Sequence, residues 1–127
     1  MTSAQSMNHL LLKAAEANPH AEALVYGSRR RTFSELAGRV AKIAGALRSL
    51  GVATGDVVPI LAMNSDRYFE YLFAVGWAGA VICPLNWRWN PNEIASVLDE
   101  CEASVILVGD GFETIAAAVG QNLPRPL

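Results

Sequence analysis

The segment TGDVVPILAMNSDRYFEYLFAVGWAGAVIC, residues 54–83, decides the fold class. Its apolar run at 57–62 is typical of a strand that is buried on both faces of a parallel sheet. A helix follows, for which Asn64 or Ser65 can provide the N-terminal cap. Residues 81–83 then predict a second short buried strand. Two strands joined through a helix by short connections indicate a right-handed parallel crossover, and therefore an α/β fold.

Two features of this unit need an explanation from packing. Pro59 has no N–H to donate, so its strand either lies at a sheet edge or turns that side away from a neighbour. Gly76 and Gly79 permit close approach of another backbone to the helix. The apolar positions that we expect to line one side of the helix are Phe69, Leu72, Phe73, Trp77 and Ala80.

Upstream of this unit the sequence predicts a helix, a hairpin and a longer helix. The first helix covers residues 7–17, and a β-hairpin follows over residues 23–33. Thr32 and Glu35 have the spacing of a capping box, and Gly51 supplies a C-terminal stop. Between these signals, apolar residues recur in alternating steps of four and three at Leu36, Val40, Ile43, Leu47 and Leu50. This pattern predicts an amphipathic helix.

Downstream of residue 83 the alternation of helices and strands continues. Asn90 and Glu93, with a proline at the first helical position between them, predict a helix start. Residues 104–108 read as a third buried strand, and 110–113 open a last helix that ends near Val119. The buried face of the helix after Asn90 is expected to contain Ile94, Val97, Leu98 and Cys101.

These elements together predict an α/β fold, with a layered sheet of mainly parallel strands and flanking helices, preceded by an N-terminal helix and a β-hairpin. No internal repeat or linker interrupts the chain, so we expect residues 1–127 to form a single α/β subdomain.

Composition excludes several classes of protein. The 127 residues are 52% hydrophobic, and 10 basic side chains against 12 acidic ones leave a net charge of -2. A broad basic face for nucleic acid is therefore not expected. The apolar run at 71–85 is shorter than the roughly 20 residues that span a bilayer. The first residues lack the features of a signal peptide, which predicts a cytoplasmic protein. Cys83 and Cys101 lack zinc-site spacing, so we expect reduced, buried thiols.

Several local patterns have both a structural and a functional interpretation. Gly109 and Gly111 open a helix after a strand, as in a dinucleotide-binding turn, but the acidic residue expected about 20 positions later has no place in this sequence. The run Arg29-Arg30-Arg31 could clamp a phosphate, although such a run at a hairpin is usually only solvated. His9 and His20 lack partners at catalytic spacing and are expected on the surface. The carboxylates Asp99, Glu100 and Glu102 fit a solvated acidic face.

Trp87-Arg88-Trp89 forms a cluster that bulk composition does not explain. The cluster follows a buried strand, which is where open α/β sheets place ligands, and the guanidinium could hold a phosphate. The alternative, which we favour, is that both rings pack against a neighbouring domain.

An ordered series of short motifs resembles the opening of the AMP-forming acyl-CoA synthetases, the acyl-adenylating ligases. The matching pieces are T32-F-S-E-L-A, G55-D-V-V, N64-S with an aromatic residue at Phe69, W77-A-G-A-V-I-C-P-L-N86, N90-P-N-E-I and S104-V-I-L-V. They run in order over about residues 20–109. The chain is thus identified as a member of this family, of which it would form the N-terminal segment. Pro59 departs from the family's usual unbroken apolar strand.

The resemblance implies an enzyme that activates a small carboxylic acid with ATP and magnesium and then transfers the acyl group to coenzyme A. The family's phosphate loop, of the form TSGTTGxPK, does not occur in these residues. We therefore expect no catalytic or metal-binding residue here and an inert isolated chain, whose partner is the remainder of the enzyme. Members often have Asn-x-Arg in the loop that contains Asn86 and Arg88, so Arg88 is the candidate contact to a CoA phosphate.

A segment removed from its enzyme should expose apolar surface, and Trp77, Trp87, Trp89 and Leu123 are the candidates for self-association. Two other functions stay open. One is a free-standing interaction or regulatory module with the same fold, and the other is a small Rossmann-like nucleotide binder that uses Gly109 and Gly111.

Overall fold

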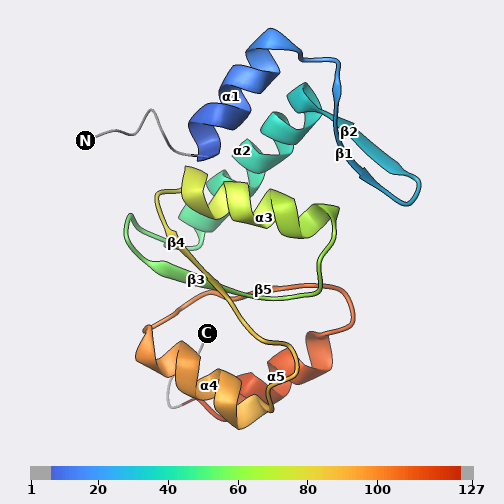
Figure 1. The fold of residues 1–127 in the computed structure, drawn as a ribbon. Helices are drawn as coiled ribbons and strands as arrows, with labels where there is room; N and C mark the ends of the chain where they lie inside the picture. Colours follow the sequence, from blue (N-terminus) through green and yellow to red (C-terminus); the bar gives the residue numbers. More distant parts are fainter. Residues whose placement is uncertain (1–6, 124–127) are drawn as a thin grey trace.

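A computed structural model describes residues 7–123 and shows a layered α/β arrangement (Figure 1). A three-stranded sheet lies between α2 and α3 on one side and α4 and α5 on the other, while α1 and a separate hairpin cover the far side of α2 and α3. The elements are α1 Met7–Ala17, β1 Glu22–Tyr26, β2 Arg29–Thr32, α2 Phe33–Ser49, β3 Val57–Leu61, α3 Asp66–Trp77, β4 Val81–Pro84, α4 Pro91–Glu100, β5 Leu107–Val108 and α5 Glu113–Gln121.

The sheet confirms the predicted parallel α/β topology. Its order is β4-β3-β5, and both pairings are parallel, whereas β1 and β2 pair antiparallel as a separate hairpin. Two strands differ from the sequence prediction. β5 comprises Leu107–Val108 instead of residues 104–108. β4 is not buried, because it lies at the edge of the sheet, and Val81 is 51% exposed.

Pro59 lies in the central strand β3, so the expectation of an edge strand is wrong. The other alternative holds, in which the side of Pro59 without an N–H group has no hydrogen-bonding neighbour. Ile60 accepts a hydrogen bond on the β4 side, from the backbone N–H of Leu85 at 2.9 Å. Leu61 accepts one on the β5 side, from Gly109 at 2.9 Å. Successive residues of a strand face opposite neighbours, so Pro59 faces the β5 side. Pairing with β5 begins only at Ile60, and Pro59 therefore removes no hydrogen bond from the ladder.

The helix ends follow the signals in the sequence. The Thr32–Glu35 capping box is complete, with the Glu35 N–H donating to the Thr32 hydroxyl at 3.1 Å and the Thr32 N–H donating to the Glu35 carboxylate at 2.8 Å. Asn90 caps α4 in the same way. Ser65, and not Asn64, caps α3. The last helix continues past the predicted end at Val119 to Gln121.

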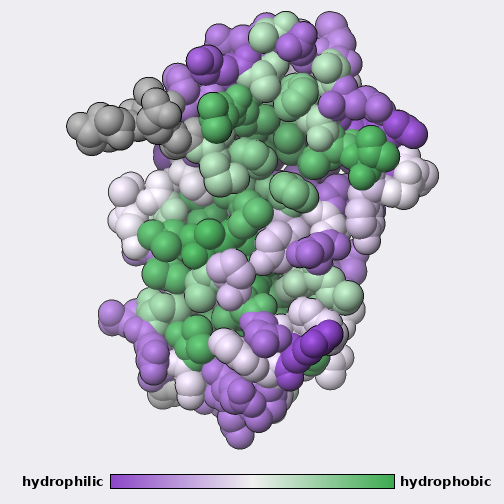
Figure 2. All heavy atoms as spheres, viewed as in Figure 1, coloured by the Kyte–Doolittle hydropathy of each residue, from purple (hydrophilic) through white to green (hydrophobic). Residues whose placement is uncertain are grey.

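Buried apolar side chains form clusters on both faces of the sheet. On one face Val58 of β3 packs with Leu47 of α2 and Val75 of α3. On the other face Leu61 packs with side chains of α4 and α5, which include Ile94, Leu98 and Val119. A third cluster joins α1 to α2 and α3 through Leu11, Leu36, Val40 and Ala74. In Figure 2, hydrophobic residues accordingly gather between the hydrophilic top and bottom of the molecule.

The predicted buried face of α3 is partly wrong. Phe69 is 50% exposed, whereas Asp66 and Glu70 are 6% and 2% exposed. Apolar spacing cannot identify a buried carboxylate, because such a group is stabilised by a partner from elsewhere in the chain. The other four predicted positions, Leu72, Phe73, Trp77 and Ala80, are half-buried.

Two smaller expectations also change. Gly76 and Gly79 approach the side chains of Asn8 and Thr54 instead of another backbone. Cys83 and Cys101 are free thiols, as expected, but both are half-buried. Burial raises the pKa of the Cys83 thiol above its ordinary value of 9.0, so this thiol stays protonated at neutral pH.

Gly109 should be intolerant of any side chain. A Cβ at this position would lie 2.6 Å from the Cβ of Ala62, so Gly109→Ala forces β3 and the β5–α5 turn apart. We expect a loss of about 1–3 kcal/mol in the free energy of unfolding, measured by urea titration. Gly45→Ala is the matched control, because no atom lies within 4 Å of its added Cβ and alanine favours a helix by about 0.5–1 kcal/mol. Equal stability of the two variants would refute this packing.

Candidate functional site

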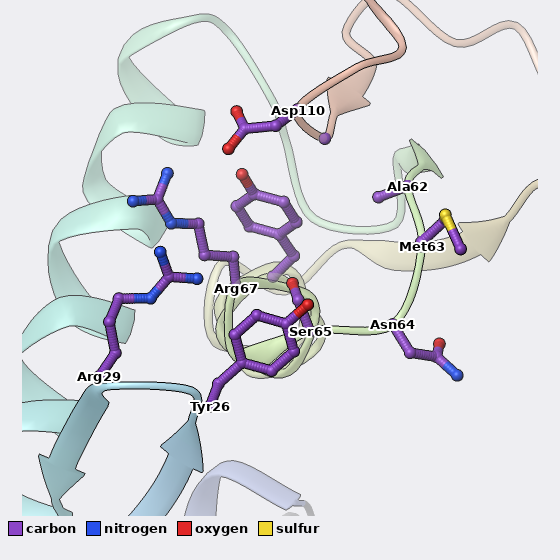
Figure 3. A pocket seen from close by; sticks show the side chains of 10 residues that line it. Tyr26, Arg29, Ala62, Met63, Asn64, Ser65, Arg67 and Asp110 are labelled. Atoms are coloured by element: carbon purple, nitrogen blue, oxygen red, sulfur yellow. The ribbon is translucent and has the colours of Figure 1, made fainter.

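A pocket of about 340 Å³ opens where the carboxyl ends of β3 and β5 meet the N-terminus of α3 (Figure 3). We call it the carboxyl-edge pocket, and its polar side chains come from Tyr26, Arg29, Asn64, Ser65, Arg67, Tyr71 and Asp110. Ala62, Met63 and Gly109 complete the wall. Open α/β sheets bind ligands at this edge. The pocket combines residues from the hairpin, from α3 and from the turn after β5.

Arg29 forms one wall of the pocket through a bidentate ion pair with Asp66. Its Nε and one terminal nitrogen donate to the two carboxylate oxygens at 2.8 and 2.6 Å. These hydrogen bonds hold the pKa of Asp66 below its ordinary value of 3.8 and raise the pKa of Arg29. Asp66 is buried, so the pair fixes the hairpin on the start of α3.

The arginines at residues 29–31 do not form one phosphate clamp, which was the less favoured interpretation of this run, since each arginine has its own contact. Arg29 binds Asp66, and Arg30 donates to Glu22 at 2.7 Å within the hairpin. Arg31 donates to the carbonyl oxygen of Arg30 at 3.2 Å. The run therefore stabilises the hairpin internally and attaches it to α3.

A second buried ion pair lies one helical turn further along α3. Glu70, 2% exposed, accepts hydrogen bonds from Nε and a terminal nitrogen of Arg39 on α2, the latter at 3.0 Å. The hydrogen bond to Glu70 raises the pKa of Arg39. Asp66 and Glu70 thus share one face of α3, and each is neutralised by an arginine from a different element.

The loop at residues 86–89 holds a stacked side-chain cluster. The Arg88 guanidinium carbon lies 5.1 Å from the centre of the Trp87 ring, and Trp87 meets Phe112 edge to face at 6.2 Å. Within residues 7–123 the Arg88 side chain has no hydrogen-bond or ion-pair partner, so its N–H donors are available to a ligand. The expectation that both tryptophans pack against another domain is neither met nor contradicted here, since Trp87 and Trp89 are 38% and 36% exposed.

The structure also places the other residues that the sequence analysis singled out. Gly109 is required by its contact with Ala62, and Gly111 adopts a positive φ of 91° that favours glycine. His20 is exposed as expected, whereas His9 is half-buried. The acidic residues at the end of α4 are exposed: Asp99, Glu100 and Glu102. Across the part of the chain that the structure describes, no helix is long and apolar enough to cross a bilayer.

The comparison with known protein families decides the chain's identity. Residues 11–125 match the family described as "AMP-binding enzyme". The chain belongs to this family. Feruloyl-CoA synthase from Amycolatopsis sp. is 39% identical over 122 residues, which are 95% of this chain and 25% of that protein. The 2-succinylbenzoate–CoA ligase of Arabidopsis thaliana is 41% identical over 79% of this chain and 18% of its own length.

Solved structures of AMP-binding enzymes share the fold. The anthranilate CoA ligase AuaEII, in complex with anthranoyl-AMP, matches 94% of this chain and 23% of its own with a TM-score of 0.87 and 25% identity. A long-chain-fatty-acid CoA ligase from Rhodopseudomonas palustris, described as putative, matches 95% of this chain with a TM-score of 0.86 and 31% identity. The chain spans about a fifth to a quarter of the length of the curated relatives it matches.

The acid stability of the fold should depend on Asp66. Its pKa is lowered in the folded state, so its contribution is fully present above the ordinary value of 3.8 and is lost as the pH falls through the folded-state value. We expect the free energy of unfolding to decline between about pH 5 and pH 2, and to decline less in Asp66→Asn. Urea titrations across this range give the slope. The exposed Glu100→Gln is the control, and identical slopes for both variants would contradict the assignment.

Proposed function

We propose that residues 1–127 are the N-terminal scaffold segment of an AMP-forming acyl-CoA synthetase and the first part of a larger adenylating domain. The observation that carries the proposal is the family match over residues 11–125, on a fold that spans about a quarter of its relatives. The whole enzyme would convert a carboxylic acid and ATP to an acyl-adenylate and pyrophosphate, and would then form the acyl-CoA. Its compartment would be the cytoplasm.

The isolated chain should not catalyse adenylation. The transition state for attack on the α-phosphate requires cations and N–H donors that are already aligned with the developing charge. The sequence lacks the lysine-containing phosphate loop. Within residues 7–123, no group of three or more His, Cys, Asp and Glu side chains is arranged to hold a metal ion. The remainder of the enzyme would supply ATP and magnesium binding.

Arg88 is the residue of this segment that we propose for contact with a phosphate of CoA. The unpaired guanidinium rests on the Trp87 ring, and Trp87 is in turn supported by Phe112, which is buried. A cation held against an aromatic face keeps its orientation and still presents its N–H edges to an anion. The geometry therefore fits a phosphate contact.

The partner of this segment would be the rest of the enzyme, and exposed apolar residues could instead join two copies of the isolated chain. Trp87 and Trp89 are exposed and remain candidates for such contact. Trp77 and Leu123 are half-buried against the core and have less surface to offer. Sedimentation equilibrium distinguishes self-association from a monomer.

Exchange of radiolabelled pyrophosphate into ATP tests the proposed function. The 127-residue chain should show no exchange with any carboxylic acid, because the family's lysine-containing phosphate loop does not occur in it. A chain extended through the phosphate loop and the C-terminal domain should show exchange with its cognate acid. Exchange by the short chain, or its absence from the complete enzyme with a broad panel of acids, would contradict the proposal.

Substitution of Arg88 should affect the thiol step alone. In the complete enzyme, Arg88→Gln is expected to raise KM for CoA about tenfold, the loss typical of one charge-assisted hydrogen bond. The rate of pyrophosphate exchange should not change, since adenylation precedes CoA binding. Lys13→Gln, an exposed substitution on α1, serves as the control. An unchanged KM for CoA in the Arg88 variant removes the assignment.

A further inference from the structure

Two arginine side chains that line the carboxyl-edge pocket have N–H groups without a partner in the part of the chain that the structure describes. Asp66 engages only part of the Arg29 guanidinium, whose side chain is 37% exposed, and Figure 3 shows this group beside that of Arg67. Within the described residues the Arg67 guanidinium has no hydrogen-bond or ion-pair partner. Two arginines therefore present unused N–H groups to the same space. Such forks match the oxygens of a phosphate or carboxylate.

The acidic side chain that lines the pocket does not pair with these two arginines. Asp110 is the acidic side chain that lines it, and Figure 3 shows the carboxylate pointing toward Arg67 from the turn after β5. Among residues 7–123 Asp110 makes no ion pair within 4 Å, although it is near enough to contribute to the raised pKa of Arg29. A gap thus separates the carboxylate from the guanidinium groups. Its charge would compete with an incoming anion.

The surroundings favour a ligand with a phosphate group. The pocket lies at the carboxyl edge of parallel strands and beside the first turn of α3, a helix of 12 residues whose N-terminus adds positive potential. The ring of Tyr26 borders the pocket with its hydroxyl group at the end (Figure 3), and Tyr71 is a second aromatic residue that lines the pocket. A volume of about 340 Å³ accommodates a phosphate together with a small organic group.

We propose that the carboxyl-edge pocket is a binding site for a phosphate group, held by Arg67 and by the free edge of Arg29. This site is separate from the Arg88 loop, and the proposal does not rest on the proposed function. Asp66 neutralises the charge of Arg29 and fixes its orientation, so Arg67 supplies most of the attraction. The phosphate can come from inorganic phosphate or from a phosphate monoester.

Titration of the ¹⁵N-labelled 127-residue chain tests the proposal with inorganic phosphate and phenyl phosphate as probes. We expect saturable amide shifts at Arg67, Gly109 and Asp110, with a dissociation constant of about 1 mM. Arg67→Gln should weaken binding at least about fivefold, as expected for the loss of a charge-assisted contact. Asp110→Asn should strengthen it about threefold, because a competing surface charge is removed. Lys42→Gln, exposed on α2, should have no effect.

The two probes separate the sources of the phosphate. Tighter binding of phenyl phosphate supports a monoester whose organic group contacts the tyrosines, and equal binding supports inorganic phosphate. The absence of saturable shifts with both probes would overturn the proposal. It would also be overturned if Lys42→Gln weakened binding as much as Arg67→Gln, or if Asp110→Asn weakened it, since the first indicates diffuse surface charge and the second a structural role for Asp110.

Discussion

Strand β3 hydrogen-bonds to β4 on one side and to β5 on the other, and it contributes side chains to the apolar clusters on both faces of the sheet. Val58 points into the cluster with α2 and α3, while Leu61 points into the cluster with α4 and α5. The strand accommodates Pro59 because β5 begins to pair only beyond it. The close contact of Gly109 with Ala62 then sets how near β5 can lie. Packing around one strand thus positions both the carboxyl-edge pocket and the layers that flank it.

Helix α3 contributes two buried carboxylates, Asp66 and Glu70, which form ion pairs with arginines of other elements. Burying Asp66 and Glu70 without partners would cost several kcal/mol each. Bidentate contacts from Arg29 and Arg39 offset that cost and require the hairpin and α2 to approach α3 in one orientation. The pairs therefore contribute specificity of packing more than net stability. They also leave the outer edge of Arg29 at the pocket, so the same contact that orders the hairpin shapes a candidate binding surface.

Local signals in the sequence predicted most elements, because caps and apolar periodicity act within a few residues. The Thr32–Glu35 capping box and the Asn90 cap are examples, and the ordered motifs were sufficient to identify the family. The long-range contacts were not predictable. The exposure of Phe69 follows from ion pairs that join residues 31 and 37 positions apart, which no local pattern contains. A hint was present, since Asp66 and Glu70 lie four residues apart on a helix whose other side chains, apart from Arg67, are apolar or aromatic. Only the structure could show that the guanidinium groups of Arg67 and Arg88 have no hydrogen-bond or ion-pair partner among the described residues.

The described residues thus form a scaffold, in which polar groups mainly join elements, while Arg29, Arg67 and Arg88 retain unused donors. Native-state hydrogen exchange tests the central claim that β3 unites its two sides. The amides of β3 should exchange slowest, and the helices α3 and α4 on opposite faces should share the same free energy of opening, as parts of one cooperative unit. Slow exchange in α3 combined with independent, low-energy opening of β3, α4 and α5 would contradict this account.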